Sequence, residues 1–339
     1  MILITGAAGF IGSALAHKLA CFQKPFLMLD KLSYAGHYEN ISSVVESQSA
    51  KFIQGDIQDY DLCLKVLKEY SVSTVMNLAA ETHVDNSIQG PKPFIETNIS
   101  GTYALLEATR AYWSELPPRE KSAFRFLHIS TDEVFGELGR EGYFTEATSY
   151  SPRSPYSASK AASDHLVRAW HHTYGLPTIV TNCSNNYGPR QFPEKLIPRM
   201  IDCALRGEKL PVYGKGENIR DWIHVEDHVE GLLLAYKNGE VGETYCFGGR
   251  SERKNLDVVT SICKALDVLR PRSQGHYADL ISFVTDRAGH DFRYAIDDKK
   301  AETELGFRRQ YKSFEEGLMQ TVKWYLENTQ WIEKVKSKK

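Results

Sequence analysis

Tyr156 and Lys160 are side chains whose types and spacing suit proton transfer. They stand four residues apart in the run YSASK, directly after a proline, so a helix starting here carries both on one face. A tyrosine hydroxyl has a pKa of about 10 and is a poor base at neutral pH. A neighbouring ammonium and a cationic nicotinamide would lower that pKa. The pair therefore predicts removal of a hydroxyl proton while hydride leaves the same carbon. An isolated YxxxK pair, however, more often consists of two exposed side chains with no catalytic role.

Asp132 and Glu133 are adjacent carboxyl groups that follow Ser130 and Thr131 at the end of an apolar run. If their pKa values are pushed apart, one can act as an acid while the other acts as a base. Such a pair could remove a proton and protonate a departing hydroxyl. The spacing does not decide which residue is the acid, and an isolated Asp-Glu pair more often lies in a solvated loop.

The glycines of TGAAGFIG, residues 5–12, are spaced by three between a candidate strand and a candidate helix. This spacing permits a tight turn, close approach of the backbone to a pyrophosphate and a helix N-terminus that faces the phosphates. Asp30 ends the next strand and can accept hydrogen bonds from a ribose diol, which favours NAD over NADP. Asp56 and Ile57 follow the third strand, where they could reach the adenine or form an ordinary exposed loop.

Short apolar runs alternate with helical patterns through the first half of the chain. Candidate strands are 2–4, 26–29, 51–53, 74–78, 124–129 and 178–180, and candidate helices are 10–20, 59–70, 97–112 and 156–174. Strands separated by helices predict βαβ units. We therefore expect an α/β fold, a Rossmann-type doubly wound parallel sheet with a smaller C-terminal substrate-binding lobe.

The regular alternation ends near residue 181, where Gly and Pro become frequent. We place the dinucleotide-binding domain at 1–180 and the substrate-binding domain at 181–339. The later segment at about 221–250 could return to the first domain. A last amphipathic helix is predicted at about 313–328. The basic tail, Lys334 to Lys339, is most simply a solvated and frayed terminus.

The composition excludes several classes of protein. The 339 residues carry 41 Lys and Arg against 43 Asp and Glu, a net charge of −2 that provides no overall field for nucleic acid or an anionic membrane. No stretch approaches the roughly 18 apolar residues of a bilayer span, and no basic segment precedes the first apolar run as in a signal peptide. The six cysteines lack CxxC spacing, so we expect reduced thiols, a cytoplasmic protein and no metal site.

Together these motifs resemble the extended short-chain dehydrogenase/reductase family, which includes the NAD-dependent epimerases and dehydratases. The blocks are TGAAGFIG (5–12), LAA (78–80), STDEVFG (130–136) and YSASK (156–160). Further blocks resemble the dTDP-glucose 4,6-dehydratases within it: DKLSYAG (30–36), AAETHVDNSI (79–88), SNNYGPRQFPEKLIP (184–198), PVYGKGENIRDWIHVEDH (211–228), KNLDVV (254–259) and DRAGHDFRYAID (286–297). They span nearly the whole chain in the expected order.

The resemblance implies a reaction without net oxidation. Tyr156, aided by Thr131 and Lys160, would take the 4-hydroxyl proton of the sugar as hydride passes to NAD. The 4-ketone acidifies the C5 hydrogen, which Glu133 would remove while Asp132 protonates the leaving C6 hydroxyl. Return of the hydride to C6 would give a 4-keto-6-deoxy sugar.

The resemblance also implies two sets of binding residues and a homodimer. The dimer would form through the helices at about 93–113 and 156–174. The NAD-binding set is Gly6, Gly9, Phe10, Ile11, Gly12, Asp30, Lys31, Leu32, Ser33, Asp56, Ile57, Leu78, Ala79, Ala80, Thr97, Tyr156, Lys160 and Asn186. The nucleotide-sugar set is Thr82, His83, Thr131, Asn185, Lys195, Leu196, Pro211, Tyr213, Arg220, Asn255, Arg287 and His290.

Several of these assignments have alternatives. His83 by itself is more often structural, Tyr213 could stack on a pyrimidine or simply pack, and Asn186 could cap a local turn. UDP- or CDP-glucose could replace dTDP-glucose. A 4-epimerase needs no acid-base pair such as 132–133, and a non-catalytic NAD-binding protein could keep the fold. The chain departs from the family at three positions: Asn86 for arginine, Phe135 for tyrosine and Ala288 for proline.

Overall fold

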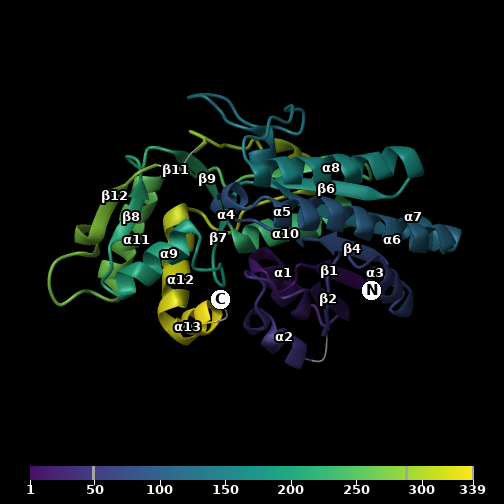
Figure 1. The fold of residues 1–339 in the computed structure, drawn as a ribbon, viewed down its shortest axis with the longest axis horizontal. Coiled ribbons are helices and arrows are strands. Elements are labelled where there is room, and N and C mark those ends of the chain that lie inside the picture. The colour runs from purple at the N-terminus through teal and green to yellow at the C-terminus, as the bar shows by residue number, and fades with distance from the viewer. Residues whose placement is uncertain (48–49, 287–288, 338–339) are drawn as a thin grey trace.

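The structure is a computed structural model that describes residues 1–47, 50–286 and 289–337. Its larger part is built on a sheet of seven parallel strands in the order β10-β6-β5-β4-β1-β2-β3 (Figure 1). The strands are β1 (Ile2–Thr5), β2 (Phe26–Asp30), β3 (Ala50–Gln54), β4 (Thr74–Asn77), β5 (Arg125–Thr131), β6 (Thr178–Cys183) and β10 (Thr244–Phe247). This sheet confirms the predicted α/β class.

Helices cover both faces of this sheet, which is why its central strands are almost entirely buried. On one face α1 (Phe10–Ala20) packs against α10 (Val225–Asn238). On the other, α3 (Tyr60–Glu69) packs against α6 (Thr102–Glu115), and α6 packs against α8 (Pro155–Tyr174). Shorter helices in this half are α2 (Ser42–Glu46), α4 (Val84–Gln89), α5 (Lys92–Phe94) and α7 (Pro118–Ala123), with 3₁₀ turns at Tyr38–Asn40 and Asp132–Phe135 and a π-helical segment at Ile95–Gly101.

A second lobe lies to the left in Figure 1 and has its own core. It contains a three-stranded sheet, β11-β9-β7, and a parallel pair, β12-β8. The strands are β7 (Asn185–Tyr187), β8 (Leu210–Tyr213), β9 (Ile219–His224), β11 (Glu252–Lys254) and β12 (Ile281–Val284). The helices are α9 (Leu196–Leu205), α11 (Asn255–Leu269), α12 (Phe314–Glu327) and α13 (Thr329–Ser337), with a 3₁₀ turn at Tyr277–Leu280. A π-helical segment at Ala301–Leu305 packs instead on α10 and β10 of the larger part.

The chain crosses between the two parts more than once. Strand β9 pairs with β7 and β11 in the second lobe. The two elements that follow it return to the larger part: α10 packs with α1 on one face of the seven-stranded sheet, and β10 is a strand of that sheet. The chain therefore contributes strands to the main sheet both before and after residue 180. The domain boundary at residue 180 stays a prediction.

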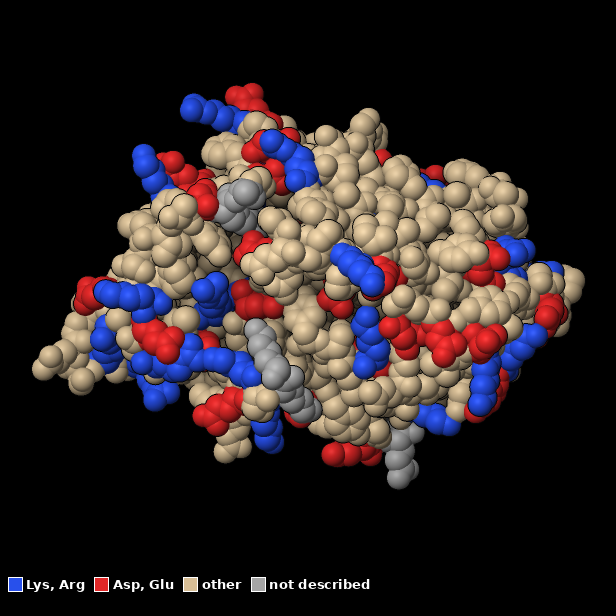
Figure 2. Space-filling view, viewed as in Figure 1, with Lys and Arg blue, Asp and Glu red and all other residues tan. Residues whose placement is uncertain are grey.

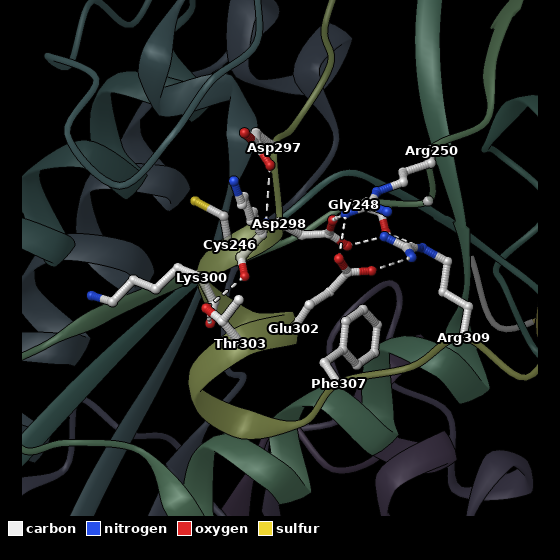
Figure 3. Close-up of polar contacts among 12 residues, drawn as sticks. Cys246, Gly248, Arg250, Asp297, Asp298, Lys300, Glu302, Thr303, Phe307 and Arg309 are labelled. Atoms are coloured by element: carbon white, nitrogen blue, oxygen red, sulfur yellow. Dashed lines mark hydrogen bonds and ion pairs between the residues drawn. The ribbon is translucent and has the colours of Figure 1, made fainter.

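A cluster of ion pairs joins the segment after β10 to the chain around residues 298–309 (Figure 3). The buried Asp298 carboxylate lies between two guanidinium groups, Arg250 at 2.9 Å and Arg309. Glu302 pairs with the same two arginines, and Arg309 also donates to the Gly248 carbonyl. This cluster holds the two segments together at the end of β10.

The basic tail is not frayed over its described part, which corrects the sequence prediction. Residues 334–337 belong to α13, Val335 is fully buried and Lys336 Nζ lies 2.8 Å from the Asp202 carboxylate. The helix docks because Trp331, Ile332 and Val335 recur on one face and join the core of the second lobe.

Charged side chains of both signs alternate over the visible face of the molecule, as Figure 2 shows. Within the described residues, no helix has the length and apolar character that crossing a bilayer requires.

Candidate active site

A cavity opens at the carboxyl ends of β1, β2, β4, β5 and β6, where the ends of parallel strands meet and ligands characteristically bind. All five predicted catalytic residues line it, as do most of the predicted cofactor residues and four of the substrate residues, one of which, Thr131, is also in the catalytic set. The cofactor residues on its wall are Gly6, Gly9, Phe10, Ile11, Gly12, Asp30, Lys31, Ser33, Asp56, Ile57, Leu78, Ala79, Ala80, Thr97, Tyr156, Lys160 and Asn186.

The turn between β1 and α1 excludes side chains at two of its glycines. Gly6 has φ +66°, and a Cβ there would lie 2.7 Å from the backbone at Leu78 and Ala79. A Cβ at Gly12 would lie 2.1 Å from the Gly6 carbonyl oxygen. The bare backbone and the N-terminus of α1 therefore face the cavity as an anion-binding cradle.

Asp30 supports this turn from the end of β2. Its carboxylate accepts hydrogen bonds from the backbone nitrogens of Ala8 at 2.9 Å and Leu32 at 2.8 Å. Burial raises the pKa of Asp30, an effect that these two bonds oppose. Leu32 does not line the cavity, because its side chain packs against the core beside α1.

Lys31 joins the predicted adenine end of the cavity to the segment before α6. Its Nζ donates to Thr97 Oγ1 at 2.9 Å and lies 3.6 Å from Asp56 and 3.8 Å from Glu81. Glu81 was not predicted, although it stands in the AAETHVDNSI block.

Thr131, Asp132 and Glu133 lie where β5 ends in a 3₁₀ turn. The Thr131 hydroxyl accepts from the Glu133 backbone nitrogen at 3.3 Å and donates to Asp132 Oδ1 at 3.3 Å. Burial raises the pKa of Asp132 well above its ordinary value, and the nearby carboxylates of Glu133 and Asp221 raise it further. Asp132 is therefore suited to hold a proton, the state that an acid catalyst needs.

Tyr156 and Lys160 lie in the first turns of α8. The helix begins at the capping residue Ser154 with Pro155 in its first turn, which fixes where the Tyr156 ring enters the cavity. Lys160 Nζ donates to the Ile129 carbonyl oxygen at 2.8 Å, and burial lowers the pKa of Lys160.

The expected lowering of the Tyr156 pKa by Lys160 is wrong for the protein chain by itself. Burial and the Glu133 carboxylate raise the pKa of Tyr156 well above 10, while the Thr131 hydroxyl opposes that rise. The Lys160 ammonium lies one helical turn away, and burial of both side chains outweighs its effect on the Tyr156 pKa.

The predicted substrate residues divide into two groups. Thr82, Asn185 and Lys195 line the cavity together with Thr131, and Lys195 Nζ donates to the Thr82 carbonyl oxygen at 2.8 Å. Arg287 lies outside the described residues, as does the departure at Ala288. The predicted residues that do not line this cavity are His83, Leu196, Pro211, Tyr213, Arg220, Asn255 and His290.

Arg220, a predicted diphosphate ligand, is only 5% exposed. Its guanidinium donates to the backbone carbonyls of Asp291 at 2.9 Å and Ile219 at 2.7 Å and stacks 4.2 Å above the Tyr294 ring. Its charge lowers the pKa of Asp132, so it acts on the candidate acid across a distance. A role in direct diphosphate binding stays a prediction.

Three polar residues have structural partners that the sequence left open. His83 caps α4 by accepting from the Asn86 backbone nitrogen at 3.3 Å. Asn186 donates to the Ser184 carbonyl oxygen at 2.9 Å while also lining the cavity. Tyr213 directs its hydroxyl to the Asp85 carboxylate at 3.5 Å.

The other two departures from the family pattern lie away from the cavity wall. Asn86 is exposed on α4, and Phe135 stacks on Phe144 in a small separate core. Sequence reasoning also missed several cavity residues that adjoin predicted ones, because only their neighbours matched a chemical pattern. These are Tyr34, Ser130, Cys183, Ser184, Gln191 and Phe192.

Several buried polar atoms on the cavity wall have no hydrogen-bond partner among the described residues. They are Ser130 Oγ, Asp132 Oδ2, Ser184 Oγ and Asn185 Oδ1. Buried groups without partners are costly, so these atoms favour a polar ligand. Together with the glycine cradle, they make the cavity suited to a dinucleotide beside a hydroxyl-rich substrate.

Comparison with known proteins gives likenesses over nearly the whole chain. A profile of the GDP-mannose 4,6 dehydratase family matches residues 3–321. A dTDP-glucose 4,6-dehydratase of Salmonella typhimurium is 55% identical over 346 aligned residues, which cover 99% of this chain and 95% of that protein.

Two solved structures of dTDP-glucose 4,6-dehydratases superpose closely on this fold. The one from Bacillus anthracis, in complex with NAD, is 42% identical with a TM-score of 0.87 and covers 98% of this chain and 99% of its own. The one from Streptomyces venezuelae, with NAD and TYD bound, is 40% identical with a TM-score of 0.90 and the same coverage.

Proposed function

Because the chain belongs to the dTDP-glucose 4,6-dehydratases, within the NAD-dependent epimerase/dehydratase family, we propose that the cavity described above removes water from dTDP-glucose. The products are dTDP-4-keto-6-deoxyglucose and water, so the enzyme is a hydro-lyase. The observation that carries the assignment of its site is the adjacent pair Asp132 and Glu133 on the same cavity as Tyr156. An epimerase has no need of that pair.

The enzyme uses NAD, for which the glycine cradle between β1 and α1 supplies the pyrophosphate site. When bound, NAD takes hydride from C4 of the hexose and returns it to C6. Asp30 is placed to accept hydrogen bonds from the adenosine ribose, and Asp56 with Ile57 would lie at the adenine. A buried carboxylate at Asp30 also disfavours a 2′-phosphate by charge repulsion.

Tyr156 accepts the proton of the 4-hydroxyl in the first step, with the Thr131 hydroxyl beside it. The raised Tyr156 pKa favours the neutral phenol, which cannot accept a proton, so Tyr156 must first lose its own proton, and positive charge near the ring favours the resulting phenolate. Lys160 supplies one such charge from the next turn of α8 and the nicotinamide ring supplies the other.

Asp132 and Glu133 divide the elimination between them. Asp132 is the acid that protonates the leaving C6 hydroxyl, since its surroundings keep it protonated. Glu133, which is only partly buried, is the base that takes the C5 proton. Asp132 is the more deeply buried of the two, which suits it to the role that requires a bound proton.

Thr82, Asn185 and Lys195 lie where the sugar diphosphate would enter the same cavity. Lys195 begins α9 in the second lobe yet bonds to Thr82 beyond β4, so it reaches the substrate from the opposite side. This arrangement lets both lobes contact one nucleotide sugar.

We also propose a homodimer formed through α6 and α8. These helices pack side by side and expose large side chains, with Tyr103 at 50% and Tyr174 at 46% exposure. Tyr103 and Trp170 contact each other edge to face across the two helices. Exposed aromatic groups on adjoining helices are typical of a protein interface.

Incubation of the purified protein with dTDP-glucose, UDP-glucose and CDP-glucose, followed by mass spectrometry, tests the reaction and the donor together. We expect loss of one water from dTDP-glucose at a rate well above the other two. A product of unchanged mass and inverted C4 configuration would indicate an epimerase. No change in any sugar would indicate a protein that binds NAD without catalysis.

A further inference from the structure

Asp164 is a fully buried carboxylate directly behind the candidate catalytic residues. It stands four residues after Lys160 on α8, so the two side chains share one face of the helix. Asp164 does not line the cavity, and none of the steps derived above uses it.

The Asp164 carboxylate accepts hydrogen bonds at one of its oxygens and lies beside a histidine at the other. Tyr150 donates its hydroxyl to Oδ2 at 2.8 Å, and Asn182 on β6 donates its amide at 3.4 Å. His128 on β5 places Nε2 3.3 Å from Oδ1. The Asn182 amide also donates to the Thr131 carbonyl oxygen at 3.0 Å, which links Asp164 to the end of the strand that carries Thr131.

His128 lies beside Asp164 without a charge, and its Nε2 is hydrogen-bonded to the Ser163 hydroxyl at 3.2 Å, which leaves Asp164 Oδ1 without a hydrogen-bond partner among the described residues. Thr5 donates to the side-chain oxygen of Asn77 at 2.6 Å, which leaves the Asn77 amide nitrogen to donate to His128 Nδ1 at 3.1 Å. The imidazole proton is therefore on Nε2, facing Asp164 and Ser163. Burial lowers the pKa of His128 to about 4, so the ring is neutral near pH 7.

The charge of Asp164 has no cation in direct contact. Within the part of the chain that the structure describes, no Lys or Arg nitrogen lies within 4 Å of it. Arg168, one turn further along α8, donates instead to Tyr150 at 2.8 Å and Thr244 at 3.2 Å. The Lys160 ammonium is thus the buried positive charge that faces Asp164 on the cavity side.

Lys160 and Asp164 influence each other through their opposite charges. Burial disfavours the ammonium, and Asp164 is the largest influence that restores its pKa. Cys183 also faces Lys160, but burial raises the pKa of that thiol, so it is uncharged near pH 7. A buried ammonium without a compensating charge would be strongly destabilised.

We propose that Asp164 is a positioning residue, a buried counter-ion that keeps Lys160 protonated and ties α8 to the end of β5 through Asn182. The inference rests on the proposed function, because it assigns Asp164 to the reaction in which Lys160 takes part. It predicts an effect on proton transfer from a residue that touches neither substrate nor NAD.

The first test compares the pH dependence of kcat in wild type, Asp164→Asn and Asp164→Glu with dTDP-glucose. Without the carboxylate, Lys160 loses its proton at lower pH, so the alkaline limb of Asp164→Asn should move down by at least about 0.5 pH unit. Asp164→Glu keeps the negative charge, so its alkaline limb should lie at the same pH as that of the wild type. The control Asp202→Asn removes a carboxyl group from α9, away from the cavity, and should leave the profile unchanged. An unmoved limb in folded Asp164→Asn would overturn the proposal.

The second test needs no catalysis and so separates this inference from the proposed function. Lys160→Met should leave Asp164 as an uncompensated buried charge and raise its pKa. The loss of melting temperature should therefore be larger at pH 8 than at pH 5, since protonation of Asp164 as the pH falls relieves the uncompensated charge. The double variant Lys160→Met/Asp164→Asn should lack that pH dependence. An equal loss at both pH values in Lys160→Met would contradict the charge pairing, whatever the activity of the wild type.

Discussion

The indole nitrogen of Trp331 donates a 2.8 Å hydrogen bond to the side-chain oxygen of Asn40, which lies 291 residues earlier in the chain. The Asn40 amide donates in turn to the Ala8 carbonyl oxygen at 2.8 Å, within the glycine turn. The final helix, α13, therefore braces the loop that forms the coenzyme cradle.

Replacement of Trp331 by Phe should weaken this brace. Loss of one buried hydrogen bond, with Asn40 left short of a donor, should lower the free energy of unfolding by about 1–3 kcal/mol. Urea unfolding followed by tryptophan fluorescence and far-UV circular dichroism measures the change. Trp324→Phe is the matched control, because its indole nitrogen makes no hydrogen bond within the described residues. Equal losses in the two variants would show that packing, not the bond to Asn40, is responsible.

Glu133→Gln should separate oxidation from dehydration. The amide cannot take the C5 proton, but Tyr156 and Lys160 remain, so mixing with dTDP-glucose should still produce the absorbance of reduced nicotinamide. Overall turnover should fall by about 10²–10⁴-fold. Glu141→Gln, on an exposed loop, is the control. Normal release of the dehydrated sugar by Glu133→Gln would exclude Glu133 as the base.

Asp132→Asn should lower the turnover rate and raise the melting temperature, the latter to an extent that depends on pH. A carboxyl group whose folded pKa is raised holds its proton more tightly in the folded state, so it costs stability as pH rises above its unfolded value of about 4. The variant should melt at a higher temperature than wild type at pH 8, and the gap should close toward pH 4. Turnover should fall by at least about 10²-fold. Calorimetry across this range checks the first expectation, and a constant gap would contradict the raised pKa.

Tyr103→Glu should dissociate the proposed dimer. A carboxylate in the middle of an apolar interface has no partner there, so the association constant should fall by at least about 10-fold. Sedimentation velocity at micromolar concentration measures the change. Tyr143→Glu provides a control at another exposed tyrosine, on the loop after the 3₁₀ turn at Asp132–Phe135. A wild-type protein that sediments as a monomer would refute the dimer itself.

Local sequence signals predicted the features that depend on local structure. The strand, glycine turn and helix at residues 2–20 follow from spacing and hydrophobicity, and the cradle lies at that junction. The pairing of Tyr156 with Lys160 followed from helical periodicity in the same way. The position of Asp132 and Glu133 could also be predicted, because the apolar run that precedes them marks the end of β5.

Features that depend on distant segments were not predictable from these patterns. Arg220 matches a phosphate ligand by type, and this role stays a prediction, but its bonds to the backbone carbonyls of 291–292 exist only in the folded lobe. The tail was assigned to solvent by its lysines, whereas Trp331 and Val335 anchor it to a core from other helices. The pKa of Tyr156 likewise depends on burial, which motif spacing does not report.

The position of β10 limits where the chain can be divided into two pieces that each fold. Residues 244–247 complete the main sheet beside β6, after the chain has already begun the second lobe. A fragment ending near residue 180 would carry a bare, apolar strand edge of the kind that recruits foreign strands and aggregates. A split of the enzyme near residue 180 would therefore leave the main sheet incomplete unless β10 were supplied to the first piece.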